Sequence, residues 1–335
     1  GIRDRRKSLV GSEMCIRDST YVAREIALDR QVAIKEYFPI DFAARRDQGS
    51  AVPRSADCAP DYEWGLERFI DEAQTLARFD HPNIVRVFRY FRANNTAYIV
   101  MKYEEGRSFK RWLADLGRAP RQRELDQFVD PLLDALSVVH AADMLHRDIA
   151  PDNIIVRSDG SPVLIDFGAA RSDLAQHSRT VSALVKPGYS PYEQYAEIGK
   201  QQGPWTDIYA LAATLYHAIT GKRPPDAPSR VVRDELVPAR EAAISAYRAR
   251  FLKAIDRGLL IDIKRRPQGI AEWRGDLLAP EEKGQRGWFG ASFAGRQQAA
   301  ITAGDVEHTA KTIVWGNGGE DGGDHADGAV PPPPD

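Results

Sequence analysis

Four short clusters of residues that could do chemistry follow one another along the sequence. The first ends in Lys35, in the run VAIK, and the second is Glu72. The third is HRDIAPDN, residues 146–153, and the fourth is DFG, residues 166–168. Carboxylate and carboxamide oxygens are ligands that Mg2+ prefers, and a carboxylate can accept a proton from a hydroxyl group. With a lysine to neutralise phosphate charge, these residue types suit phosphoryl transfer, which needs positioning and electrostatics more than covalent chemistry.

The order of the four clusters resembles the signature of protein kinases, and the resemblance covers residues 20 to about 279. Each cluster alone is weak. A lysine in a strand is usually a solvated charge, a glutamate in an amphipathic helix usually lies at the surface, and a DFG run can be a tight turn. Because these ordinary explanations are nearly independent of one another, the joint occurrence of all four in order favours the kinase interpretation.

The resemblance implies a role for each residue of the constellation. Lys35 would contact the α- and β-phosphates of ATP, and Glu72 would pair with Lys35 and hold its flexible side chain. Asn153 and Asp166 would bind Mg2+, and Asp148 would accept or orient the proton of the substrate hydroxyl. ATP and Mg2+ are therefore the expected cofactors.

The same resemblance assigns supporting residues. His146 and Phe167 are expected to pack rather than to react, Gly168 completes the DFG motif, and Arg147 is placed to pair with a phosphorylated activation segment. The expected nucleotide pocket is formed by Val32, Ala33, the gatekeeper Met101, and the backbone of Lys102 and Glu104.

Two further links would hold the helical part of a kinase together. Glu193, in the run SPYEQ, would form a buried ion pair with Arg266. Asp207 would hold the backbone of the catalytic loop, although a carboxylate near the positive end of a helix dipole is an alternative explanation for it.

The sequence departs from the kinase pattern at two places. Counting back from Thr20 puts the three glycines of the phosphate-clamping loop at Glu13, Cys15 and Asp18, and none of these residues can let a backbone approach phosphates closely. Ala150 stands where Ser/Thr kinases usually carry a lysine that touches the γ-phosphate, so that charge is either missing or supplied elsewhere.

Residues 1–19 look foreign to the domain. Leu9–Ser19 reads LVGSEMCIRDS, which is what a transposase-based sequencing-library adapter encodes. We interpret residues 1–19 as a non-native segment that replaced the glycine-rich loop and exclude it from the fold, the alternative being an ordinary polar arm. The chain as given should then bind ATP poorly.

Hydrophobic periodicity predicts an α+β, bilobal fold, with an N-lobe over residues 20–104 and a C-lobe over 105–279. The N-lobe should hold two hairpins and one helix, and residues 36–61 should form a long loop. Helices are expected at 64–79, 109–116, 125–141, 207–220 and 246–260, strands at 20–24, 31–37, 84–91, 96–103, 154–157 and 163–165. Residues 280–335 are expected to be a flexible, acidic, Gly/Pro-rich tail.

Composition excludes several classes of protein. Hydrophobic residues make up 43% and charged residues 28%, which is typical of a globular domain, and the net charge of −2 gives no field for nucleic acid. Two cysteines cannot build a disulfide framework, and no run of about 18 apolar residues could span a membrane. We expect a cytoplasmic location, with an anchor beyond residue 335 left open.

Regulation would run through phosphorylation. Thr180 or Ser178 is the expected autophosphorylation site, with Arg147 as the partner of the phosphate, and the alternative is simply a hydroxyl-rich loop. A phosphorylated Thr309 or Thr312 could recruit a phosphopeptide-binding partner, although two ordinary linker threonines explain the same run.

The flanking sequences resemble bacterial Ser/Thr kinases of the eukaryotic-like (Hanks) type. The expected function is ATP-dependent phosphorylation of Ser/Thr hydroxyls on protein substrates. A pseudokinase serving as a binding or scaffold module is the alternative, and a small-molecule phosphotransferase is a second one.

Overall fold

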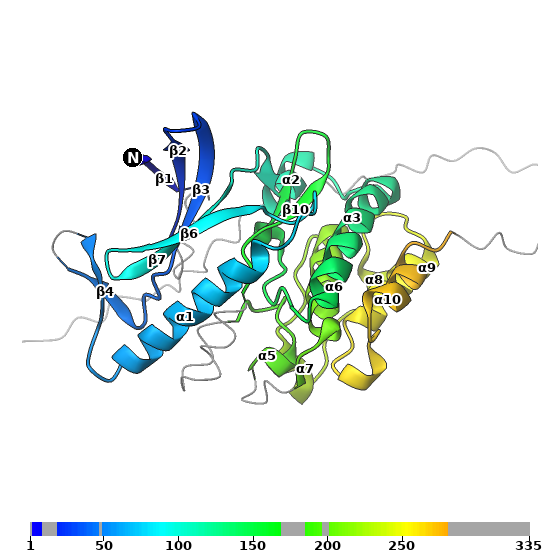
Figure 1. Ribbon diagram of the computed structural model, residues 1–335. Coiled ribbons are helices and arrows are strands. Elements are labelled where there is room, and N and C mark those ends of the chain that lie inside the picture. Colours follow the sequence, from blue (N-terminus) through cyan, green and yellow to red (C-terminus); the bar gives the residue numbers. More distant parts are fainter. Residues whose placement is uncertain (1, 9–18, 47–48, 169–184, 196–200, 281–335) are drawn as a thin grey trace, which may run out of the picture.

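The computed structural model describes residues 2–8, 19–46, 49–168, 185–195 and 201–280 (Figure 1). Its N-terminal part is an antiparallel sheet with the strand order β1-β2-β3-β7-β6. The turn between β6 and β7 consists of Asn94 and Asn95, both with positive φ, as two-residue hairpins require. The strands are β1 (Ile2–Ser8), β2 (Ser19–Glu25), β3 (Arg30–Glu36), β6 (Val87–Ala93) and β7 (Thr96–Lys102).

The outermost strand corrects one expectation. Residues 2–8, which the sequence analysis excludes from the fold, form β1 and pair with β2 from Ile2↔Glu25 to Ser8↔Tyr21, with a register shift between Asp4 and Ser8. Without β1, strand β2 would be the edge of the sheet, and its unpaired N–H and C=O groups would be open to any neighbouring extended segment.

The expected long loop over residues 36–61 is the second correction. It contains a small hairpin of β4 (Ala43–Arg45) and β5 (Ala51–Pro53), closed by a turn in which Gly49 has φ +86°. The two strands are too short to show the alternation of apolar and polar residues that predicts a strand. Pro53 in β5 also argues against a strand at the level of sequence. The hairpin is nevertheless anchored, because Ala43 and Ala51 are fully buried.

Helix α1 (Ala59–Leu76) lies across the N-terminal sheet and contacts β6 and β7 (Figure 1). Pro60 occupies its first turn, where the missing N–H costs nothing. Buried side chains recur at Tyr62, Leu66, Phe69, Ala73 and Leu76, which is the spacing of one helix face.

The larger, helical part is built around α6 (Pro204–Thr220), which is buried on nearly every side and ends at the left-handed Gly221. The other helices are α2 (Phe109–Leu116), α3 (Gln122–Ala141), α5 (Tyr192–Tyr195), α7 (Ala227–Val232), α8 (Ala239–Ala242), α9 (Ala249–Gly258) and α10 (Ile270–Leu277), with 3-10 turns η2 (Pro151–Asn153) and η5 (Ile263–Arg265). A small sheet of order β10-β9-β8 combines β8 (Arg107–Ser108), β9 (Ile154–Val156) and β10 (Pro162–Leu164).

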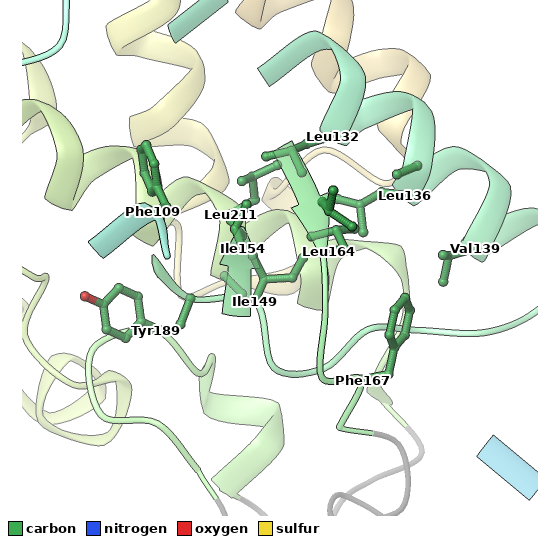
Figure 2. Packing of buried hydrophobic residues seen from close by; sticks show 14 of the residues in the cluster. Phe109, Leu132, Leu136, Val139, Ile149, Ile154, Leu164, Phe167, Tyr189 and Leu211 are labelled. Carbon is green, nitrogen blue, oxygen red and sulfur yellow. The ribbon is translucent and has the colours of Figure 1, made fainter. Parts of the chain in front are cut away.

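One continuous hydrophobic core runs beneath the small sheet. Figure 2 shows Leu132 and Leu136 of α3 near Ile154 and Leu164, and Val139 of the same helix toward Phe167. The core therefore supports the loops on both sides of β9 and β10, which contain most of the predicted site residues.

Backbone contacts join the two parts. Val85 N–H donates to Leu164 O at 2.9 Å, and Leu164 N–H donates to Asn83 O at 2.8 Å. The architecture is thus the bilobal α+β fold that the sequence predicts. No helix in the described ranges is both long and apolar enough to cross a membrane.

Candidate active site

Lys35 lies between two carboxylates that the sequence predicts to be functional. Its Nζ is 3.9 Å from Glu72 Oε1 and 3.8 Å from Asp166 Oδ1. Lys35 and Glu72 are almost fully buried, whereas about a quarter of the Asp166 side chain is exposed. The Lys35 head group is therefore enclosed by the protein on the Glu72 side, and the more exposed Asp166 marks the open side of the site.

The elements explain how Lys35 and Glu72 meet. Strand β3 directs Lys35 toward α1, while α1 places Glu72 on the same buried face as Phe69 and Ala73. The Lys35 ammonium lies 5.8 Å from the centre of the Phe69 ring. The head group therefore has an aromatic ring as well as carboxylates around it.

Asp207, at the start of α6, holds the catalytic loop by its backbone. Its Oδ2 accepts hydrogen bonds from His146 N at 2.9 Å and from the His140 ring at 2.8 Å, and its Oδ1 accepts one from Arg147 N at 2.8 Å. Burial alone would raise the pKa of Asp207, but the hydrogen bonds from His140 and from the Arg147 backbone help to lower it on balance. These contacts fit the predicted structural role rather than a simple helix-dipole carboxylate.

The DFG run is fastened to the same loop. Gly168 N–H donates to His146 O at 2.8 Å, the His146 ring contacts Ile165 O at 3.1 Å, and the rings of His146 and Phe167 are 4.2 Å apart. Burial lowers the pKa of His146, which favours a neutral ring between Phe167 and Ile165 O. A Cβ on Gly168 would meet Asp148 Cβ at 3.0 Å, which explains the glycine.

Asn153 and Asp148 share a hydrogen-bond network. Asn153 Nδ2 donates to Asp148 Oδ2 at 2.8 Å and to Asp148 O at 2.7 Å. The amide nitrogen is thereby committed to Asp148, which leaves Asn153 Oδ1 as an oxygen that a cation could use.

The donor set fits Mg2+ bound together with phosphates. No cluster of three His, Cys, Asp or Glu side chains suited to a metal occurs among the described residues. Mg2+ is commonly held by one or two protein oxygens plus substrate phosphates rather than by a full protein cage. Asn153 and Asp166 would supply those two oxygens.

The predicted adenine side is apolar and buried. Val32 and Ala33 on β3 pair in register with Lys102 and Met101 on β7, and all but Lys102 are buried. Sequence reasoning did not predict that the side chain of Glu104 would be held by Arg157, at 2.9 Å.

Two ion pairs involve the end of the activation segment, and one of them reaches the site. Glu193 and Arg266 form the predicted ion pair at 2.6 Å, and both are buried. Lys186 Nζ lies 3.3 Å from Asp148 Oδ1, a contact that the sequence analysis missed. The only signal for it was the absence of a lysine at Ala150. Ser178, Thr180, Thr309 and Thr312 lie outside the described residues.

Comparison with known proteins gives consistent matches. The family described as "Protein kinase domain" matches residues 53–247. The chain is 31% identical over 216 residues to serine/threonine-protein kinase PrkC of Bacillus subtilis, covering 64% of this chain and 30% of that protein. It is 31% identical over 273 residues to serine/threonine-protein kinase PknB of Mycobacterium leprae, covering 77% of this chain and 40% of that protein.

Solved structures agree with the fold. The structure titled "PpkA-294 apo form" superimposes with a TM-score of 0.73 at 35% identity, covering 82% of this chain and 95% of that chain. The kinase domain of Mycobacterium tuberculosis PknI, at 23% identity and a TM-score of 0.57, shares the fold. The chain spans 30–40% of the length of the two curated relatives described above.

Proposed function

The chain belongs to the protein kinase domain family, and from this premise we propose that it transfers the γ-phosphoryl group of ATP to serine and threonine hydroxyls of protein substrates. The observation that carries the proposal is the placement of Lys35 between Glu72 and Asp166, at 3.9 and 3.8 Å. A scaffold that binds no nucleotide has no need to keep a cation buried between two carboxylates, because each buried charge is costly.

In the proposed reaction the residues act in fixed places. Lys35 binds the α- and β-phosphates, and Glu72 holds the Lys35 side chain. Asp148 accepts the hydroxyl proton as the oxygen attacks the γ-phosphorus. Mg2+ held by Asn153 and Asp166 would neutralise phosphate charge when bound. Val32, Ala33, Met101 and the backbone of Lys102 and Glu104 would enclose the adenine.

The same proposal keeps the two lobes over residues 20–104 and 105–279, with the nucleotide between them. His146, Phe167 and Gly168 serve as packing that fixes the loops, in keeping with the contacts at 2.8–4.2 Å described above. Phosphorylation of Ser178 or Thr180 and pairing with Arg147 remain part of this proposal.

The test compares the full chain with a variant in which Glu13→Gly, Cys15→Gly and Asp18→Gly restore the three loop glycines. Both are incubated with radiolabelled ATP, Mg2+ and casein, and the labelled amino acids are identified. We expect the glycine-restored chain to label serine and threonine, and Asp148→Asn in that chain to reduce the rate by about 10²-fold or more.

The opposite result is equally clear. If the glycine-restored chain binds Mg-ATP, measured by thermal shift, but transfers no phosphate to casein or to itself, the protein is a nucleotide-binding pseudokinase. Label on tyrosine alone would contradict the proposed specificity.

A further inference from the structure

The carboxylate of Asp148 is contacted on each oxygen by a different group. Asn153 Nδ2 donates to Oδ2 at 2.8 Å, while Lys186 Nζ lies 3.3 Å from Oδ1. The Asp148 side chain is 12% exposed and the Lys186 side chain 28% exposed. An ammonium group therefore lies beside the proposed base, on a side that solvent and a substrate can still reach.

The backbone of Lys186 is fixed by a turn. Lys186 N–H donates to Ser190 Oγ at 3.0 Å, and Lys186 O accepts from Tyr189 N–H at 3.0 Å and from Ser190 N–H at 2.9 Å. Gly188 has φ +83° within this turn, and a Cβ there would meet Pro224 O at 2.7 Å. The position of the Lys186 Cα is thus set by backbone geometry that favours glycine at 188.

Two contacts connect this turn to the catalytic loop and to α6. Gln194 Nε2 donates to Arg147 O at 2.7 Å, directly before Asp148. The hydroxyl of Tyr189 shares a hydrogen bond of 2.7 Å with His217 Nδ1. The segment that contains Lys186 is therefore hydrogen-bonded both to the loop that contains Asp148 and to α6.

The catalytic loop itself provides no cation after the base. Ala150 is fully buried and ends in a methyl group, and its carbonyl accepts from Asn153 N–H at 2.9 Å to begin η2. Lys35 is already flanked by Glu72 and Asp166. A phosphoryl group in transfer carries charge on three oxygens beside Asp148, so a further cation at that point would stabilise the transition state.

We propose that Lys186, from the activation segment, supplies the catalytic cation at the transferred phosphoryl group that the loop lacks at Ala150. The inference rests on the proposed function. In the step, the substrate hydroxyl oxygen bonds to the γ-phosphorus, and the bond from that phosphorus to the β–γ bridging oxygen breaks. ADP leaves with the electron pair, the hydroxyl proton passes to Asp148, and the Lys186 ammonium group binds the γ-phosphoryl oxygens.

The experiment uses the glycine-restored full chain and three substitutions. Lys186→Met removes the charge but keeps an unbranched stem, Lys186→Arg keeps a charge, and Lys222→Ala is the control for loss of an exposed lysine nearby. We expect Lys186→Met to lower kcat about 10²-fold with little change in the KM for casein, as loss of one transition-state donor does elsewhere. Lys186→Arg should retain more activity than Lys186→Met, and Lys222→Ala should match the unsubstituted chain.

Binding gives a second readout that is independent of turnover. The affinities for Mg-ATP and Mg-ADP are measured by calorimetry, and Lys186→Met should lower the ATP-to-ADP affinity ratio, because only ATP carries a γ-phosphate. If the unsubstituted glycine-restored chain transfers no phosphate, the proposed function fails, yet this ratio still tests the Lys186 contact.

A rescue experiment tests whether positions 150 and 186 serve one site. Ala150→Lys in the Lys186→Met chain should recover at least tenfold in kcat, provided that circular dichroism shows native folding. If this folded double variant shows no recovery, the two positions do not substitute for each other and the proposal fails in that form. If Ala150→Lys does not fold, the Lys186→Arg rate and the affinity ratio decide.

The opposite role for Lys186 is also measurable. If Lys186→Met leaves kcat unchanged or raises it, and the ATP-to-ADP affinity ratio does not change, Lys186 only forms an ion pair with Asp148 when no substrate is bound. That result would overturn the proposal.

Discussion

Several charged side chains in this protein are buried next to groups with which they form ion pairs or hydrogen bonds. Lys35, Glu72 and Asp207 are at most 4% exposed, and each has oppositely charged or hydrogen-bonding neighbours. Such groups rarely add net stability, since desolvation offsets the attraction between them. Their cost is more reasonably explained by the geometry that they impose on the site.

Motifs made some of these residues predictable and left others hidden. Lys35 and Asp166 could be found because each lies in a recognisable run, and Glu72 because it lies in the predicted helix that follows Lys35. Lys186 could not be found in this way, because the residues next to it form no local pattern that points to Asp148. Its role depends on a turn closed by Ser190 and on the shape of Gly188, which only the folded chain reveals.

His217 gives a pH dependence that can be measured. Burial lowers the pKa of His217 to about 4. Lys110 and Arg223 add smaller lowering effects, and Asp152 has a smaller raising effect. The unfolded chain binds this proton near pH 6.5, so stability contributed by neutral His217 is present above that pH and is lost as pH falls toward 4. The free energy of unfolding falls by about 3 kcal/mol at most through this group.

We expect His217→Gln to flatten part of the fall in the free energy of unfolding between pH 6.5 and 4. Glutamine can still accept a hydrogen bond from Tyr189 but does not titrate. Urea unfolding at a series of pH values would measure this, with the unsubstituted protein as reference. Parallel curves for the two proteins would show that His217 is not buried as a neutral base.

At the scale of elements, the hairpin of β4 and β5 is attached to the site through Glu36. This glutamate directly follows Lys35 on β3 and is 2% exposed. Its carboxylate accepts from Arg45 at 2.7 and 2.6 Å, and from the hydroxyls of Tyr21 and Tyr98 at 3.1 and 3.0 Å. The hairpin therefore secures the end of the strand that presents Lys35.

This hairpin is also where sequence reasoning failed. Helices such as α1 and α3 could be predicted because their buried side chains recur over several turns. The strands β4 and β5 have three residues each, and what fixes them is a distant carboxylate rather than a local pattern. β1 was not predicted because residues 1–19 were excluded as a foreign segment, whereas an edge strand needs only backbone pairing.

Arg45→Met should destabilise the protein by about 2 kcal/mol, because it leaves the buried Glu36 charge with phenol donors alone. This loss of stability is smaller than the loss expected for a fully buried ion pair, because the Arg45 side chain is 37% exposed. Arg54→Met is the matched control, as this exposed arginine of the same hairpin donates to the carbonyl of Ile40. Chemical denaturation of both variants measures the difference, and adding Glu36→Gln to Arg45→Met should restore part of the loss. Equal effects of the two arginine variants would contradict an anchoring role for Glu36.

At the scale of the whole molecule, a few long-range links hold the activation segment to the helical lobe. Glu193 and Arg266 are 73 positions apart, yet they form two hydrogen bonds of 2.6 and 3.1 Å and are both buried. Thr206 also donates to Glu193 at 3.2 Å, and the Arg266 guanidinium lies 4.9 Å from the centre of the Tyr209 ring. The pair could be predicted from the family resemblance alone, because nothing local to either residue points to the other.

A double-mutant cycle across this pair tests how strongly the segment is bound. Glu193→Gln or Arg266→Met alone should cost about 3–5 kcal/mol, because each leaves the other charge buried without its ionic partner. The double variant should cost less than the two single losses combined, by about 2 kcal/mol or more. The exposed i,i+4 pair of Arg111 and Asp115 is the control, and its coupling should not exceed about 0.5 kcal/mol. Urea unfolding of all variants gives the coupling energies, and additive losses at Glu193 and Arg266 would mean that the end of the segment is held by its apolar contacts instead.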